Sequence, residues 1–160
     1  MIPLTDQYDY YHGGIATFLR WRSLAIDDFA PFYDTSSVVY DDFEHYVSTL
    51  LSHRSNWTGL TMGDDPTVLA FETGNELGGW TRDDHAPPVS WTRAIAAHIR
   101  SLAPLTLIMS GSYGVRQDEL GIPNVDMVSD HFYPLYTSTL QGSAAVAQSG
   151  AVPFLVGEYD

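Results

Sequence analysis

Short apolar runs that alternate with longer helical segments are the feature that most limits how this chain can fold. The candidate strands occupy residues 1–4, 67–71, 105–109, 125–129 and 153–157. Segments 36–53 and 88–103 repeat apolar residues every three or four positions, which predicts helices, and 139–148 is a weaker helical stretch. Near-continuous apolar strands joined by helices predict an α/β fold with a covered parallel sheet, either doubly wound or closed into a barrel.

Polar side chains follow the apolar runs at the point where each run ends. Glu76 lies in GNE after the second run, His131 lies in DHFYP after the fourth, and Glu158 lies in VGEYD after the last. In a (β/α)8 barrel the C-terminal ends of the strands form the rim where active sites are built. A carboxylate at a wet rim is tolerable, whereas a buried one without a partner is costly. We therefore expect a site at this rim.

Glu76 and Glu158 are the candidate catalytic pair. They are far apart in sequence, but the ends of strands in a closed barrel approach each other across its mouth. Retaining glycosidases need two carboxyl groups about 5 to 5.5 Å apart, one as nucleophile and the other as general acid and then base. A lone glutamate after a strand is more commonly a solvated cap or a salt-bridge partner, so the prediction depends on the residues around the pair.

Four neighbouring residues favour sugar chemistry. Asn75 could hydrogen-bond the hydroxyl next to the reacting carbon, where such bonds tighten in the transition state. Tyr133 could donate to a carboxylate, and His131 could contact a substrate hydroxyl or adjust the proton of the acid. Trp80, between glycine and a polar loop, is a candidate sugar-stacking platform, with a structural role as the open alternative.

Other conspicuous residues favour structural roles. Trp91 lies on the apolar stripe of a predicted helix and is expected in the core, while Trp21 is a further candidate platform. Glu72 would share a face with Glu76 by strand alternation, and we expect it to pair with a basic residue or to help set a proton affinity.

Composition excludes several classes of function. The chain has 20 acidic and 7 basic residues, a formal net charge of −13, which disfavours nucleic acids and anionic membrane surfaces as partners. No apolar stretch approaches the roughly 20 residues of a membrane span. Cysteine is absent, and the acidic and histidine-rich loops lack a recognised ligand spacing, so we expect no metal or other cofactor. Serine-elbow and nucleotide-binding motifs are absent as well.

Three segments together resemble glycoside hydrolase family 5: GNE, SDHFYP and VGEYD, in that order. More narrowly, three longer segments are similar to the endo-β-1,4-mannanases of that family, and the likeness covers essentially the whole chain. These segments are IPLTDQYDYYHGG, FYDTSSVVYDDFEHYVSTLL and TGLTMGDDPTVLAFETGNEL.

The resemblance implies a (β/α)8 barrel that hydrolyses internal β-1,4 linkages of a mannan-type polysaccharide with retention and without a cofactor. It implies that Asn75 and Glu76 close the fourth barrel strand, with Glu76 as acid/base. By the same likeness His131 and Tyr133 close the sixth strand, and Glu158 closes the seventh as nucleophile. It further implies an extracellular protein that is a monomer when complete.

The chain departs from the family in its extent. Residues 1–160 are expected to form one partial catalytic domain holding about strands three to seven of eight. The strands that carry an active-site arginine and a tryptophan under the reacting sugar in the family have no counterpart. An open arc exposes two apolar sheet edges, so we expect the piece alone to fold poorly or aggregate and to be inactive.

Three alternatives stay open at this point. A β-1,4-glucanase or a β-mannosidase of the same family would use the same pair on another substrate. A non-catalytic carbohydrate-binding protein would keep an aromatic groove and would not need both glutamates. A metal-dependent barrel hydrolase would lose its activity with a chelator.

Overall fold

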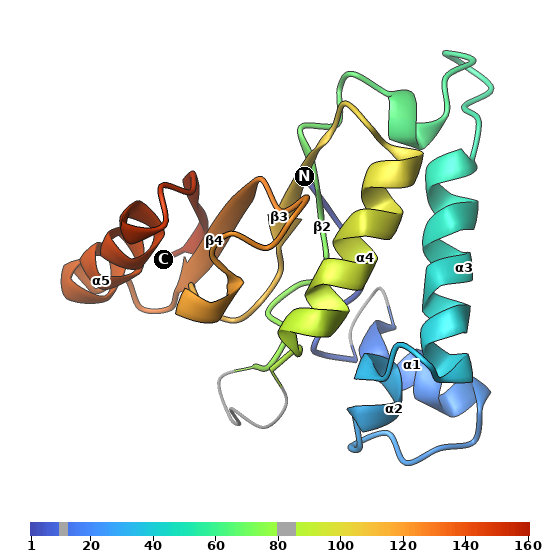
Figure 1. The fold of residues 1–160 in the computed structure, drawn as a ribbon, viewed down its shortest axis with the longest axis horizontal. Helices are drawn as coiled ribbons and strands as arrows, with labels where there is room; N and C mark the ends of the chain where they lie inside the picture. Colours follow the sequence, from blue (N-terminus) through green and yellow to red (C-terminus); the bar gives the residue numbers. More distant parts are fainter. Residues whose placement is uncertain (10–12, 80–85) are drawn as a thin grey trace.

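Five parallel strands form one sheet in sequence order. The computed structural model describes residues 1–9, 13–79 and 86–160. Its strands are β1 (Ile2–Pro3), β2 (Ala70–Glu72), β3 (Leu107–Ser110), β4 (Met127–Phe132) and β5 (Phe154–Tyr159), and each pairs in parallel with the next. Neighbouring parallel strands joined through helices are the repeating unit of a (β/α)8 barrel, and the chain forms an incomplete portion of that fold (Figure 1).

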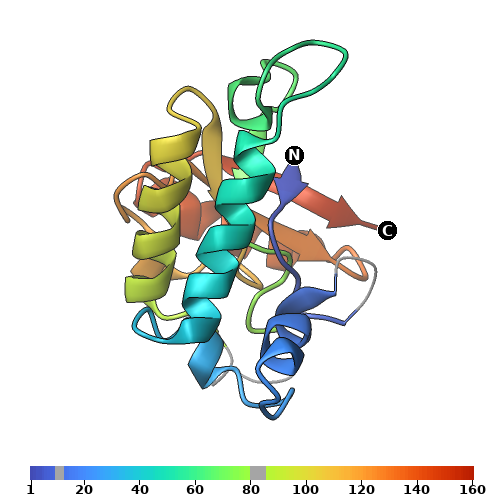
Figure 2. The same cartoon turned by 90° about the vertical axis from the view of Figure 1, so that its right-hand side faces the viewer.

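The connections between the strands are helical. The helices are α1 (Gly14–Trp21), α2 (Ala30–Tyr33), α3 (Val38–Ser52), α4 (Val89–Leu102) and α5 (Thr137–Ser149), with 3₁₀ turns η1 (Met62–Asp64) and η3 (Gln117–Glu119). Ser37 caps α3 by accepting a hydrogen bond from the backbone N–H of Tyr40 at 3.1 Å. Helices α3 and α4 lie side by side, and α5 lies beyond β4 (Figures 1 and 2).

The main core lies between the sheet and helices α1 to α4. Phe71 of β2 and Ile108 of β3 point into it and are fully buried, as are Phe43 and Trp91 from the helices. The Trp91 ring stacks on Phe43 with centroids 5.9 Å apart and is 0% exposed. Trp91 is therefore a core residue, which confirms the prediction from its helical stripe.

The opposite face of the sheet carries a second, smaller apolar cluster. Ala70, Met109 and Met127 are buried there, with Leu155 of β5 packed against them. Cross-strand partners share a face of a sheet, and Ala70, Met109 and Met127 come from three successive strands. This face is the one that lines the interior of a barrel, and the polar site lies beyond it at the C-terminal ends of the strands.

The sequence predicted the two long helices well and the strand ends less well. Helices α3 and α4 fall inside the predicted segments 36–53 and 88–103. Strands β4 and β5 run past their predicted ends, so that His131 and Glu158 lie within strands and not in loops after them. Helices α1 and α2 were not predicted, since glycine, proline and aromatic residues obscure their pattern.

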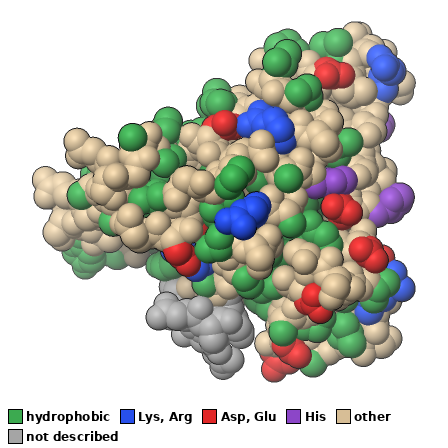
Figure 3. Space-filling model, viewed as in Figure 1, with side chains coloured by type: hydrophobic (Ala, Val, Ile, Leu, Met, Phe, Trp, Pro, Cys, Tyr) green, Lys and Arg blue, Asp and Glu red, His purple; other side chains and the backbone are tan. Residues whose placement is uncertain are grey.

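On the side of the two long helices, the surface carries charged side chains of both signs. Acidic, basic and histidine side chains are scattered there among apolar ones (Figure 3). None of the helices in the described ranges has the length and apolarity that a membrane crossing requires.

Candidate active site

Glu76, His131 and Glu158 meet at the C-terminal ends of β2, β4 and β5. The Nδ1 atom of His131 lies 2.7 Å from Oε1 of Glu76 and 3.7 Å from Oε2 of Glu158. One ligand atom from each of the three side chains lies within 4.8 Å of the other two. The structure thus brings together three of the residues that sequence reasoning selected. Two of them, Glu76 and His131, are 55 positions apart along the chain.

A tightly held loop positions Glu76. The residue has a positive φ of 50°, which a non-glycine residue adopts only where the surroundings enforce it. The backbone N–H of Asn75 donates to the carbonyl of Thr5 at 2.8 Å, and the N–H of Leu77 donates to the carbonyl of Gly111 at 2.8 Å. The loop is therefore fixed on both sides by the loops of neighbouring strands, and it keeps Glu76 on the same hollow as Glu72.

Gly111 allows two of these loops to approach. A Cβ atom built on Gly111 would lie 1.7 Å from the carbonyl oxygen of Gly74, a distance that no side chain can occupy. The backbone N–H of Gly111 also donates to Oγ1 of Thr73 at 2.9 Å. Gly111 and Gly74 therefore pack directly against each other, and this contact fixes the position of the Glu76 loop relative to the sheet.

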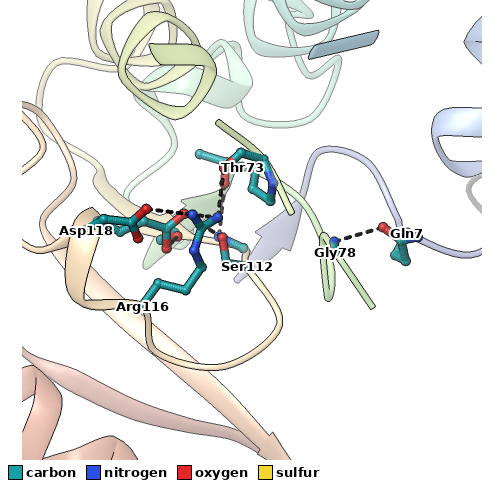
Figure 4. A network of polar contacts seen from close by, with 10 residues as sticks. Gln7, Thr73, Gly78, Ser112, Arg116 and Asp118 are labelled. Atoms are coloured by element: carbon teal, nitrogen blue, oxygen red, sulfur yellow. Dashed lines mark hydrogen bonds and ion pairs between the residues drawn. The ribbon is translucent and has the colours of Figure 1, made fainter. Parts of the chain in front are cut away.

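Buried polar contacts also stabilise the segment that follows β3. The carboxylate of Glu119, which is 1% exposed, accepts hydrogen bonds from Ser110 and Ser112 at 2.8 and 2.5 Å. Burial raises the pKa of Glu119, and the two serine hydroxyls only partly offset that rise. Arg116 donates to Asp118 at 2.7 Å, and Figure 4 shows Arg116, Asp118 and Ser112 beside Thr73. These contacts fix the shape of the segment after β3, and the hydrogen bond from Gly111 to Thr73 joins that segment to the one that carries Glu76.

Tyr133 orients the second carboxylate. Its hydroxyl donates to Oε2 of Glu158 at 2.8 Å. That hydrogen bond, more than partial burial, raises the pKa of Tyr133 to about 12, since the phenol is needed as a donor to an ionised partner. The Tyr133 residue and the Glu158 side chain are 56% and 48% exposed, so this half of the site is open to solvent.

Glu76 and His131 behave as a charged pair. Burial raises the pKa of Glu76, but hydrogen bonds from His131 and Tyr8 outweigh it, and the pKa lies below its ordinary value of 4.5. Burial lowers the pKa of His131, but the contact with Glu76 and the charges of Glu158, Glu76 and Glu72 outweigh it, and the pKa lies above 6.5. Between these two values the pair holds one proton on the imidazole, 2.7 Å from the Glu76 carboxylate.

Glu72 lies beneath this pair, on the inner face of β2. The residue is 6% exposed, and its Oε1 atom accepts a hydrogen bond from Ser129 at 3.3 Å. Burial raises the pKa of Glu72 to about 7, although the charge of His131 and the Ser129 hydrogen bond act in the opposite direction. The charge of His131 therefore offsets the burial of Glu72 only in part, and the Glu72 carboxyl group is only partly ionised at neutral pH.

Replacing Glu72 by Gln is expected to stabilise the chain at alkaline pH. Between its ordinary pKa of 4.5 and about 7, folded Glu72 keeps a proton that the unfolded chain has lost, so stability falls as pH rises. The cost above pH 7 is about 3 kcal/mol, and Glu72→Gln removes it. In urea unfolding of a polypeptide that completes the barrel, we expect the variant and the parent to differ little at pH 4, and the variant to be the more stable at pH 8.

The control for this prediction is Asp27→Asn, which neutralises a carboxyl group on an exposed turn. It is expected to change the unfolding free energy by less than about 0.5 kcal/mol. A Glu72→Gln effect of the same size at pH 4 and pH 8 would show that the carboxyl group is not desolvated in the folded chain.

Three further candidates from the sequence are Asn75, Trp80 and Trp21. Asn75 donates from its side-chain amide to Oδ2 of Asp6 at 3.3 Å, which fixes the amide beside Glu76. Trp80 lies outside the described residues. Trp21, a candidate platform, is 62% exposed and contacts Phe18 edge to face with ring centroids 5.1 Å apart.

Sequence reasoning missed several residues that line the site. Tyr8 donates to Glu76, and its segment was assigned only to a polar aromatic loop. Tyr113 and Asp130 line the same hollow as Glu76 and His131. The backbone N–H of Tyr113 donates to the carbonyl of Leu77 at 2.8 Å, so the backbone at Tyr113 is joined to the Glu76 loop. Asp130 lies in SDHFYP and Tyr8 in IPLTDQYDYYHGG, but neither segment shows that these residues line the site, because the loop pairing that brings them together is not local in sequence.

Glu76, His131 and Glu158 are also, within the described ranges, the one set whose ligand atoms lie close enough to hold a metal ion. An ion bound there would engage both carboxylates and the Nδ1 atom that now contacts Glu76. It would therefore block the use of the carboxylates as acid and nucleophile. A metal-dependent mechanism and a carboxylate-pair mechanism are thus mutually exclusive at this site, and a chelator distinguishes them.

A family described as GH family 5 beta-mannosidase-like matches residues 6–133 in its sequence model. Mannan endo-1,4-beta-mannosidase 1 from Oryza sativa subsp. japonica is 28% identical over 177 residues, covering 94% of this chain and 40% of the relative. The protein of the same name from Arabidopsis thaliana is 26% identical over 183 residues, covering 99% of this chain and 43% of the relative. The chain thus spans less than half the length of these two relatives.

Solved structures match the fold over nearly the whole chain. An endo-beta-1,4-mannanase from Thermotoga petrophila superposes with a TM-score of 0.83 at 22% identity, covering 98% of this chain and 41% of that structure. An endo-1,4-beta-mannanase from Rhizomucor miehei superposes with a TM-score of 0.78 at 22% identity, covering 98% of this chain and 53% of that structure. The five-stranded arc described above is therefore an established architecture and is seen as part of a larger one in both structures.

Proposed function

Because this chain belongs to the β-mannosidase-like group of glycoside hydrolase family 5, we propose that it carries the catalytic pair of a retaining hydrolase of β-1,4-linked mannan. Residues 1–160 form the part of the catalytic domain that holds both glutamates. The activity requires the remaining strands of the barrel, and the chain alone is inactive. The proposed protein acts outside the cell, as a monomer, on a neutral polysaccharide.

The close approach of Glu76 and Glu158 is the observation that carries this proposal. Their facing oxygen atoms lie within 4.8 Å of each other, and retaining enzymes hold their two carboxyl groups about 5 to 5.5 Å apart. Inverting enzymes need roughly 6.5 to 9.5 Å, because a water molecule must fit between the sugar and the base. The separation in this site leaves no room for that water and favours a covalent glycosyl intermediate.

Glu76 is the proton donor in the first step. Its proton passes to the glycosidic oxygen as the bond between that oxygen and C1 of the sugar breaks. The carboxylate of Glu158 attacks C1 from the opposite side and forms a glycosyl ester. Half-burial of Glu76 against His131 and Tyr8 suits a group that exchanges protons, and the more open Glu158, held by Tyr133, suits the attacking group.

Water completes the reaction in the second step. The Glu76 carboxylate removes a proton from a water molecule, whose oxygen attacks C1 and displaces Glu158 as a free carboxylate. Each step inverts C1, so the product keeps the β configuration. Glu76 ends the cycle protonated and Glu158 ionised, ready for the next substrate.

His131 is the proton store for Glu76. The lowered pKa of Glu76 means that the free site holds the shared proton on the imidazole. A transfer over the 2.7 Å contact returns it to the carboxylate when a sugar displaces water and disfavours the charged pair. Activity should accordingly fall as pH rises through the raised pKa of His131, since the pair then loses its proton.

Mannan as the substrate rests on the matched family and on the names of the relatives. Both plant relatives are named mannan endo-1,4-beta-mannosidases. The acidic chain, with a formal net charge of −13, suits an uncharged polymer. Exposed rings at the C-terminal ends of the strands, Tyr113, Tyr136 and Tyr159, offer flat apolar surfaces to sugar faces.

A substrate comparison tests the proposal. Soluble galactomannan, carboxymethylcellulose and 4-nitrophenyl β-mannoside are incubated with the chain, and with a longer polypeptide that supplies the rest of the barrel. We expect the longer polypeptide to release reducing ends from galactomannan at least about tenfold faster than from the other two, and the chain alone to release none.

Other outcomes redirect the assignment. Faster release from cellulose or from the small mannoside would assign a glucanase or a mannosidase with the same pair. A folded longer polypeptide that binds galactomannan without turnover, and whose affinity survives Glu76→Gln, would be a binding protein. Loss of activity with EDTA would favour the metal-dependent alternative.

A further inference from the structure

A register shift between β4 and β5 determines where Glu158 points. Asp130 pairs with Val156, whereas the next residue, His131, pairs with Glu158, so Gly157 is an extra residue in β5. Two residues of the bulged strand then oppose one residue of its partner. The pairing is regular again at Phe132 and Tyr159, so the irregularity is confined to one position.

If the same residues paired in regular register, without the bulge, the catalytic carboxylate would face the wrong way. Leu155 lies on the inner face of the sheet, in the cluster with Met109 and Met127. Strict alternation from Leu155 would turn residue 157 inward and Glu158 outward, to the face that carries the buried Phe132. The bulge instead sets Glu158 beside His131, whose Nδ1 atom is 3.7 Å from Oε2 of Glu158.

Glycine is required at the bulge because the imidazole of His131 covers it. A Cβ atom built on Gly157 would lie 2.6 Å from Nε2 and 2.8 Å from Cδ2 of His131. Such a contact would either push the ring away from Glu76 or force β5 back into a regular register. The His131 residue contacts Glu76 on its other nitrogen, so the ring has little freedom to move.

We propose that Gly157 is a positioning residue, which through a one-residue bulge turns Glu158 into the site and leaves room for the His131 ring. The expected effect on kcat rests on the proposed function, whereas the expected effect on the position of His131 does not. A bulge beside an active site re-aims a side chain at the cost of local pairing.

Two changes at this position separate register from packing. Gly157→Ala keeps the number of residues but adds the clashing atom. Deletion of Gly157 restores strict alternation and still leaves Val156 opposite Asp130, Glu158 opposite His131 and Tyr159 opposite Phe132. Gly142→Ala, on α5 with no atom within 4 Å of the added Cβ, is the matched control.

The expected results have a kinetic and a spectroscopic part. In the longer polypeptide, Gly157→Ala should lower kcat on galactomannan by about 100-fold or more with KM changed less than threefold, since a misplaced nucleophile impairs chemistry more than binding. By ¹⁵N NMR titration of the imidazoles, with His131→Gln for assignment, the pKa of His131 should fall towards 6.5 in Gly157→Ala. The deletion should retain more activity than the substitution, and Gly142→Ala should match the parent.

The titration decides the inference independently of activity. If the parent shows no turnover but the pKa of His131 falls in Gly157→Ala as expected, the result would reject the proposed function and support the positioning role of Gly157. A folded Gly157→Ala variant with the parental kcat and the parental His131 titration would overturn the positioning role of Gly157. If Gly157→Ala does not fold, the deletion decides: activity within about tenfold of the parent supports the register argument, and a folded inactive protein with a shifted His131 overturns it.

Discussion

Glu158→Gln lowers kcat on galactomannan by at least about 1,000-fold in a polypeptide that completes the barrel, with little change in KM. The amide has the shape of the carboxylate and still accepts a hydrogen bond from Tyr133, now 2.8 Å from Oε2 of Glu158. It cannot form the glycosyl ester, so transition-state stabilisation is lost while ground-state binding remains. Initial rates of reducing-end release measure the effect.

Azide distinguishes the two glutamates by the stereochemistry of its product. In Glu158→Ala the nucleophile is gone, and azide attacking directly from that side should give an α-mannosyl azide. In Glu76→Ala the ester still forms from an activated substrate with a good leaving group, and azide should give the β-mannosyl azide. Glu44→Gln, an exposed carboxylate on α3 beside His98, is the control and should retain full activity. Exchanged azide products would reverse the assignment of acid/base and nucleophile.

Trp91→Ala destabilises the fold by about 3 to 5 kcal/mol, the largest effect on stability that we expect from one substitution. The side chain is 0% exposed and packs against Phe32, Tyr33 and Phe43 with ring centroids 5.6, 5.2 and 5.9 Å away. Its removal leaves a cavity between α2, α3 and α4 that these rings can fill only in part. Urea unfolding of the polypeptide that completes the barrel, followed by circular dichroism, measures the loss.

Two controls accompany this substitution. Trp57→Ala removes an indole that is 97% exposed and should change the unfolding free energy by less than about 0.5 kcal/mol. Trp91→Phe keeps most of the ring and removes an indole N–H for which the described residues supply no hydrogen-bond partner, so it should cost less than Trp91→Ala. Equal losses in Trp91→Ala and Trp57→Ala would contradict the position of Trp91 in the core.

Periodicity predicted the helices that pack on the sheet because burial on one face leaves a strong local signal. Residues 36–53 and 88–103 enclose α3 and α4, and Trp91 lies in the core as its stripe indicates. Helix α1 escaped prediction because it begins at a pair of glycines after a polar loop. Its apolar face becomes evident only from its contacts with α2 and α3.

The candidate site was predictable in its members and not in its geometry. Glu76, His131 and Glu158 each follow or end an apolar run, and parallel strands must bring such ends to one edge. Their roles as acid/base, proton store and nucleophile stay predictions. The positive φ of Glu76 and the extra residue at Gly157 arise from contacts between loops and strands distant in sequence, which no local pattern encodes.

Alternation placed Glu72 on the correct face but did not show what surrounds it. Counting along the strand put it on one face with Glu76, and both side chains line the same hollow, although β2 ends at Glu72 and the chain then turns. Its burial beneath His131, and hence its raised pKa, follows from the packing of β2 against β4 through Ser129. The suggestion that Glu72 helps to set a proton affinity stays a prediction.

The stereochemistry of the first product tests the central claim most directly. Galactomannan-derived mannohexaose is hydrolysed by the longer polypeptide at high enzyme concentration, and ¹H NMR follows the anomeric protons of the new reducing ends before mutarotation. The two-glutamate account predicts the β anomer first, with the α anomer appearing only as the sugar equilibrates. Initial release of the α anomer would contradict a covalent intermediate on Glu158 and the role of the Glu76–Glu158 pair.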